Sequence, residues 1–176
     1  PTSPYAEKVS SYLVEVYMNT RSYDAALKSI DRIAKPSAQI LEAKQKILFQ
    51  LGTQSFANAD FEQALKYLNQ SIAIGQYNRQ TKADAYYWCG ESYYRLNRMV
   101  EAARDFNAYL QLTTQPNNEM YALANYNLGY IAFHRKDYTQ ASNYFQKYIQ
   151  LEKGENTTAL ADAYNRIGDC HLHVRN

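Results

Sequence analysis

The sequence has little net charge and no long apolar run. Its 19 Lys and Arg residues stand against 17 Asp and Glu residues, which leaves a formal net charge of +2 at pH 7. Nucleic-acid-binding proteins usually carry a strongly basic face or stripe, and no run of Lys or Arg occurs here. No apolar stretch approaches the roughly 20 residues that span a bilayer. These absences argue against a nucleic-acid partner and against membrane insertion by this segment.

Cysteine and proline are also scarce. The two cysteines, Cys89 and Cys170, fall in separate helical stretches, too far apart for the Cα separation of about 7 Å that limits a disulfide. We therefore expect two buried free thiols. Proline is confined to the N-terminus and to connections, and the alternating pattern of strands is absent. The sequence thus predicts an all-helical fold.

Constellations typical of catalytic or metal sites are missing as well. A cysteine nucleophile needs a nearby histidine to activate it, and the helical register places none beside Cys89 or Cys170. His171 and His173 are two residues apart, which puts them on different faces of a helix. We expect no enzyme activity, no cofactor and no metal site.

What the sequence does have is a period of 38 or 39 residues. Glycines and alanines recur with this period, and a large residue stands three positions before each alanine. A period in this range indicates a solenoid of stacked helical hairpins. The recurring glycines are Gly52, Gly90, Gly129 and Gly168; the alanines are Ala26, Ala64, Ala102 and Ala141; the large residues are Tyr23, Phe61, Met99 and Tyr138.

Each unit reads as two helices joined by a short turn, because apolar residues recur at steps of three and four. We divide the chain into units 4–37, 38–77, 78–116 and 117–156, followed by the first helix of a further unit at 157–176. Since the sequence stops inside that helix, we expect a piece of a longer protein. The expected helices are about Tyr5–Met18, Tyr23–Ala34, Ala38–Ala57, Phe61–Ile74, Ala83–Arg95, Met99–Leu110, Tyr121–His134, Tyr138–Leu151 and one from Thr157.

Glycine inside a helix costs about 1 kcal/mol relative to alanine. We expect each recurring glycine to offset this cost by close packing against the alanine of its partner helix. In unit three the resulting pattern is Tyr86, Gly90 and Tyr93, followed by Met99, Ala102 and Phe106. Unit four repeats it with Asn125, Gly129, Ala132, Tyr138, Ala141 and Phe145.

This pattern resembles the tetratricopeptide repeat family. The resemblance implies a right-handed superhelical solenoid of antiparallel hairpins, with about four and a half repeats, that serves as a non-catalytic scaffold for a protein or peptide partner. The units exceed the family's usual 34 residues and are similar to those of bacterial cell-envelope members, including the Tol-Pal-associated and outer-membrane-assembly lipoprotein groups. A bacterial envelope or periplasmic setting is therefore favoured, with the cytoplasm left open.

In arrays of this family the first helices line a concave groove. Rigid, amphipathic tyrosines on such helices suit peptide binding, and tyrosine accounts for 18 of the 176 residues. The carboxylate clamp of chaperone-binding members is absent, because its positions hold Ser11, Glu15, Gln50, Asp84 and Trp88. The expected partner-binding residues are Tyr87, Glu91, Tyr94, Arg95, Tyr126, Asn127, Tyr130, His134, Asn165 and Asp169.

Two functions stay open at this point. One is a scaffold that binds a peptide or partner segment in the groove. The other is a structural spacer or oligomerisation module without a groove ligand. The last helix carries apolar residues such as Leu160, Tyr164 and Leu172 and lacks a hairpin partner, so we also expect either self-association through this helix or fraying of it.

Overall fold

The computed structural model describes residues 13–14 and 21–175. Every regular element in this part of the chain is a helix. The helix expected at Tyr5–Met18 lies outside the described residues, apart from Leu13 and Val14. The α-helices are α2 (Tyr23–Asp31), α3 (Ala38–Ala57), α4 (Phe61–Ala73), α5 (Arg79–Arg95), α6 (Met99–Leu112), α7 (Glu119–His134), α8 (Tyr138–Leu151) and α9 (Thr157–Arg175), and a 3₁₀ turn, η1, spans Gly75–Tyr77.

Side-chain caps set where several of these helices begin. The Asn78 side chain accepts a 2.9 Å hydrogen bond from the Thr81 backbone N–H, so α5 begins at Arg79 and not near Ala83 as expected. Asn118 does the same for α7, because its Oδ1 accepts from the Tyr121 N–H at 2.9 Å. Such caps satisfy backbone donors that have no partner within the helix.

The turns that join the two helices of a hairpin share one backbone conformation. Ala59, Asn97 and Lys136 each adopt a positive φ of 60°, 60° and 64°, just after the end of a first helix. In unit three the Arg98 N–H then donates to the Tyr93 carbonyl at 2.8 Å, and the Asn97 N–H donates to the Tyr94 carbonyl at 3.0 Å. This pair of bonds is a Schellman motif. Its left-handed position usually holds glycine, so the sequence alone did not reveal it.

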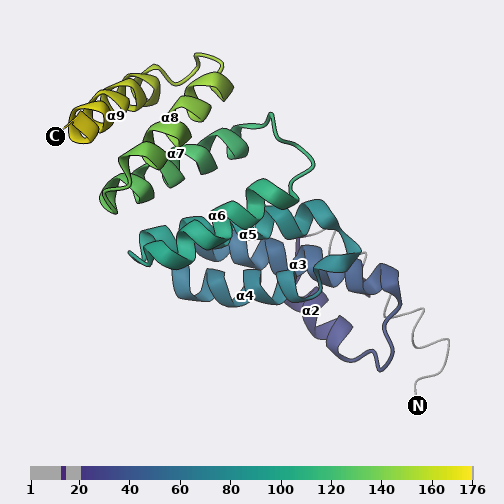
Figure 1. Cartoon of the computed structure of the whole chain (residues 1–176). Coiled ribbons are helices and arrows are strands. Elements are labelled where there is room, and N and C mark those ends of the chain that lie inside the picture. The colour runs from purple at the N-terminus through teal and green to yellow at the C-terminus, as the bar shows by residue number, and fades with distance from the viewer. Residues whose placement is uncertain (1–12, 15–20, 176) are drawn as a thin grey trace.

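The hairpins follow one another along the array in chain order, from α2 to α9 (Figure 1). Among the described helices, α6 and α7 make the least extensive junction between successive hairpins. Helix α7 nevertheless belongs to two apolar cores. Ala124, Leu128 and Ile131 pack into the central core with α4, α5 and α6, whereas Ala122 and Ala132 pack into the C-terminal core with α8 and α9.

In three hairpins a glycine of the first helix lets a large side chain of the second helix approach closely. A Cβ added at Gly90 would lie 2.8 Å from the Phe106 ring, and one at Gly129 would lie 2.8 Å from the Phe145 ring. A Cβ at Gly52 would lie 2.5 Å from the Leu68 side chain. At Gly52 the carbonyl oxygen of the expected alanine, Ala64, would also lie 3.4 Å from the added Cβ, but the nearest atoms at all three glycines belong to the larger side chain. The large residue four positions after the alanine fills the space above the glycine.

The fourth recurring glycine lacks this partner. An added Cβ at Gly168 would meet no atom within 4 Å. Helix α9 packs against α8 through Ala163 and Cys170, and its other side carries Tyr164 and Leu172, which are 61% and 64% exposed. The C-terminal helix thus presents an open glycine position with exposed apolar neighbours.

This difference predicts opposite effects for one substitution at two glycines. Gly90→Ala should lower the free energy of unfolding by about 1–3 kcal/mol, because the fully buried Phe106 ring cannot move aside without repacking. Gly168→Ala should raise it by up to about 1 kcal/mol, because alanine is the better helix former and meets no neighbour. Urea unfolding followed by circular dichroism measures both. Equal shifts of the same sign would contradict the assigned packing.

Candidate partner-binding groove

Helices α5 and α7, each the first helix of its hairpin, enclose an open hollow of about 490 Å³. We call it the α5–α7 hollow. Side chains three and four residues apart share one face of a helix, which brings successive turns of both helices into its wall. Its eight lining residues include seven of the expected partner-binding residues. The lining residues are Glu91, Tyr94, Arg95, Leu123, Tyr126, Asn127, Tyr130 and His134.

Tyr87, which we expected in the groove, belongs to the core. It is 3% exposed, and its ring packs edge-on against Phe106 and Tyr109, with centroid distances of 5.7 and 5.4 Å. The expectation that this ring faces a ligand is wrong, because Tyr87 lies on the buried side of α5. Tyr87 does not line the hollow, but its hydroxyl donates to Glu91 Oε1 at 3.0 Å.

Glu91 connects α5 to α7. The Asn127 amide donates to the same Glu91 oxygen, Oε1, at 2.7 Å. Burial, and then the charge of Glu91, raise the pKa of Tyr94. Two neutral donors from two helices therefore orient one carboxylate in the wall of the hollow.

Asp162 connects α7 to α9 in a similar way. The Tyr126 hydroxyl donates to Asp162 Oδ2 at 2.6 Å, and the Tyr130 hydroxyl donates to the same oxygen. Burial works against ionisation of Asp162, but these hydrogen bonds and the charge of Arg166 outweigh it and lower the pKa of the carboxyl group. Burial and the bond to Asp162 raise the pKa of Tyr130 to about 12. The two tyrosines are thus held in fixed positions.

The remaining expected residues, Asn165 and Asp169, do not line the α5–α7 hollow. Asp169 pairs with Arg166 at 3.2 Å, and Asn165 is exposed. Arg166 also lies 3.9 Å from Asp162 and 6.0 Å from the centre of the Phe133 ring. On α9 one arginine is therefore shared between two carboxylates.

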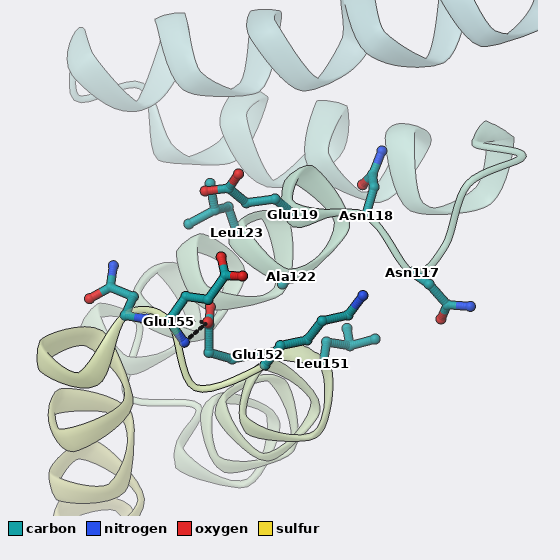
Figure 2. A pocket seen from close by; sticks show the side chains of 10 residues that line it. Asn117, Asn118, Glu119, Ala122, Leu123, Leu151, Glu152 and Glu155 are labelled. Carbon is teal, nitrogen blue, oxygen red and sulfur yellow. Dashed lines mark hydrogen bonds between the residues drawn. The ribbon is translucent and has the colours of Figure 1, made fainter.

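A second hollow, missed by the sequence analysis, lies between the α6–α7 and α8–α9 connections (Figure 2). We call it the loop hollow; its volume is about 250 Å³. Leu123 lines both hollows, so they adjoin. Glu152 accepts from the backbone N–H groups of Glu155 and Asn156 at 3.2 and 3.3 Å, and so holds the turn before α9. These two connections lie together because units four and five stack on each other, and no local sequence pattern predicts that contact.

In the described part of the chain, no three His, Cys, Asp or Glu side chains are grouped in a way that could hold a metal ion. None of the described helices is long and apolar enough to cross a membrane. The chemistry that these residues offer at the two hollows is hydrogen bonding, aromatic contact and charge pairing.

The comparisons with known proteins agree with this architecture. A family model described as tetratricopeptide repeat matches residues 49–119, and a second of the same description matches residues 122–154. Together the two matches span more than half of the chain. Among curated proteins, none matches this sequence.

Several solved structures share the fold. The crystal structure of MamA covers 97% of this chain and 84% of its own, with a TM-score of 0.63 and 18% identity. BtubC from P. vanneervenii covers 94% and 71%, with a TM-score of 0.64 and 13% identity. YrrB, described as a TPR protein with an unusual peptide-binding site, covers 89% and 73%, with a TM-score of 0.55 and 19% identity. At these identities the likeness establishes the fold alone.

The two cysteines are free and buried, as expected. Burial, and then the charge of Asp105, raise the pKa of the Cys89 thiol, and burial raises that of Cys170. Because the thiolate is the nucleophilic form, both thiols are held in the protonated, less nucleophilic form at neutral pH. Asp105 is itself unusual, since it is 2% exposed and its Oδ2 has no hydrogen-bond partner, while Oδ1 accepts from Arg104 Nε at 3.0 Å.

The buried Asp105 predicts a pH dependence of stability. Burial, offset only in part by Arg104, raises the pKa of Asp105 in the folded state. A raised folded pKa means that the folded state binds the proton more tightly, so protonation stabilises it. This contribution to the free energy of unfolding should rise as the pH falls through the folded pKa. It should level off below the unfolded value of about 3.9.

Asp105→Asn removes the buried charge and keeps an oxygen acceptor for Arg104. At pH 7 the variant should be more stable than the wild type by ~1 kcal/mol, and this advantage should shrink toward pH 4. Urea unfolding at a series of pH values checks this, with the exposed loop substitution Glu155→Gln as a control. A variant less stable than the wild type at pH 7 would mean that the Arg104 pair outweighs the burial of Asp105.

Proposed function

The chain belongs to the tetratricopeptide repeat family and is a scaffold for protein–protein interaction, and we propose that it binds a peptide segment of its partner in the α5–α7 hollow. The observation that carries this proposal is the construction of the hollow. Tyr94, Tyr126 and Tyr130 stand in its wall together with Leu123. Tyrosine offers a large amphipathic contact area at a low cost in conformational entropy.

The hydrogen bonds between the first helices support the same proposal. Asp162 fixes the hydroxyl groups of Tyr126 and Tyr130, and the Tyr126 ring packs against Tyr148 with a centroid distance of 4.9 Å. A surface whose side chains are already ordered loses less entropy when a ligand binds. YrrB, a protein of the same fold, has an unusual peptide-binding site, which adds an analogy at the level of the fold.

We further propose that binding is the whole activity of this segment, without catalysis or a cofactor. The described core buries both thiols, and the carboxylates of the α5–α7 hollow and its border with α9 are held by tyrosine, asparagine and arginine donors. In Asp162 burial is outweighed by the hydrogen bonds from Tyr126 and Tyr130 and by the charge of Arg166, so the pKa of the carboxyl group is lowered and the ionised form is favoured.

Peptides selected from a phage-displayed random library on the immobilised chain supply a probe of this site. Tyr94→Ala should weaken their binding at least tenfold, since central aromatic anchors at interfaces often contribute about 2 kcal/mol or more. Fluorescence polarisation with labelled peptides measures the Kd, and circular dichroism checks that the helices are intact.

Tyr164→Ala is the matched control, because Tyr164 is a tyrosine on a first helix outside the α5–α7 hollow. It should leave the Kd of the selected peptides unchanged. If Tyr164→Ala weakens binding and Tyr94→Ala does not, the peptide site lies on α9 and the proposal for the hollow is wrong.

The exposed apolar side chains of α9 favour a second candidate function, an oligomerisation module. Tyr164, Leu172 and Val174 are 61%, 64% and 62% exposed, and Gly168 between them is open. If two chains associate through this surface, the average mass in sedimentation velocity should rise with concentration. The double variant Tyr164→Gln with Leu172→Gln should remain a monomer.

Val100 on α6 offers the control for this experiment, because it is 65% exposed and lies far from α9 in the sequence. Val100→Gln should leave self-association unchanged. If the wild-type chain stays monomeric at every concentration, the proposed oligomerisation function is wrong.

A further inference from the structure

Glu91 is the unpaired negative charge of the α5–α7 hollow. Its Oε1 accepts from Tyr87 and Asn127 at 3.0 and 2.7 Å, and among the described residues no hydrogen bond reaches its Oε2. It takes part in none of the ion pairs found in the described part of the chain. Asp162, the neighbouring carboxylate, differs because Arg166 lies 3.9 Å from its Oδ1.

The cations near the hollow do not neutralise Glu91. Arg95 is one helical turn away, but its guanidinium lies over the rings of Phe56 and Phe61, 5.5 and 6.0 Å from their centres. Arg166 is engaged by Asp162 and Asp169. His134, the remaining basic side chain in the wall, stands beside the Tyr130 ring with a centroid distance of 6.2 Å. Glu91 is therefore available to a cation from outside the chain.

The walls around Glu91 also suit a cation. Tyr94, Tyr126 and Tyr130 line the same hollow, and the faces of aromatic rings attract ammonium and guanidinium groups. The aliphatic stems of Lys and Arg can pack along apolar surface while their charged ends reach a polar partner. Leu123 provides such a surface at the border of the hollow.

The adjoining loop hollow is also lined mainly by negatively charged side chains. Glu119, Glu152 and Glu155 line it (Figure 2), and a single lysine, Lys153, lines it as well. None of these three carboxylates takes part in an ion pair found among the described residues. The whole chain carries a net charge of +2, so this negative stretch reflects the placement of charges and not the composition.

We propose that the partner segment is basic and places a Lys or Arg side chain against Glu91 in the α5–α7 hollow, with its chain continuing over Leu123 toward the loop hollow. This inference rests on the proposed peptide-binding function. Electrostatic complementarity of this kind selects among partners and speeds their association. The Tyr87 and Asn127 donors act as positioning groups, because they hold Oε1 and leave Oε2 toward the ligand.

The phage-displayed random library used for the proposed function also tests this inference. Peptides recovered on the wild-type chain should be enriched in Lys and Arg. In one such peptide, each basic residue is then replaced by Gln in turn, and the Kd of every version is measured on wild-type chain and on Glu91→Gln. Gln keeps an oxygen acceptor for Tyr87 and Asn127, so this variant should fold normally, which circular dichroism checks.

One peptide Lys or Arg should be coupled to Glu91. Its replacement by Gln should weaken binding to the wild-type chain by about tenfold, the size of one charge-assisted hydrogen bond. The same replacement should change the Kd on Glu91→Gln by less than about twofold. Glu62→Gln on the second helix α4 makes the same charge change outside the hollow and should leave the coupling intact.

The outcomes separate the two proposals. If recovered peptides depend on Tyr94 but are not basic, or if their basic residues are not coupled to Glu91, this inference is wrong while the groove function stands. If Tyr94→Ala leaves the binding of every recovered peptide unchanged, the groove function itself fails.

Discussion

The array depends on the contact, in three successive hairpins, between a glycine of the first helix and a large side chain of the second helix. At Gly52, Gly90 and Gly129, the absence of a Cβ lets Leu68, Phe106 or Phe145 lie directly on the backbone of the facing helix. Phe106 and Phe145 are fully buried there. Because the hairpins of Gly90 and Gly129 close at this contact, the residues that follow these glycines, Glu91 and Tyr130, stand about 100° further around the helix and line the α5–α7 hollow.

A second set of interactions fixes one unit to the next. Glu91 and Asp162 each accept hydrogen bonds from side chains of α7, which lies between their own helices, α5 and α9. These bonds are polar and part-buried, whereas the contacts within a hairpin are apolar and buried. The groove is thus ordered by the same residues that are available to a ligand, which links the rigidity of the surface to its capacity for recognition.

The sequence was sufficient to predict the fold, because its glycines and alanines recur at a fixed period and each has a simple steric meaning. It also located seven of the ten expected groove residues in the α5–α7 hollow. The sequence-based prediction misplaced Tyr87, because helical register gives the direction of a side chain around the helix axis but not how far the neighbouring helix covers it. The loop hollow and the bonds to Asp162 join residues more than 30 positions apart. Such pairs depend on the stacking of units, which no local pattern records.

Helix α7 has a mechanical consequence for the whole array. Its residues enter both the central and the C-terminal cores, while its junction with α6 is the least extensive among the described hairpins. A pulling force applied along the array would have to pass through this one helix. Parting α6 from α7 would remove Ala124, Leu128 and Ile131 from the central core but leave the C-terminal core of α7, α8 and α9 packed. Under tension the protein would thus lengthen first at this junction, and the α5–α7 hollow would open with it.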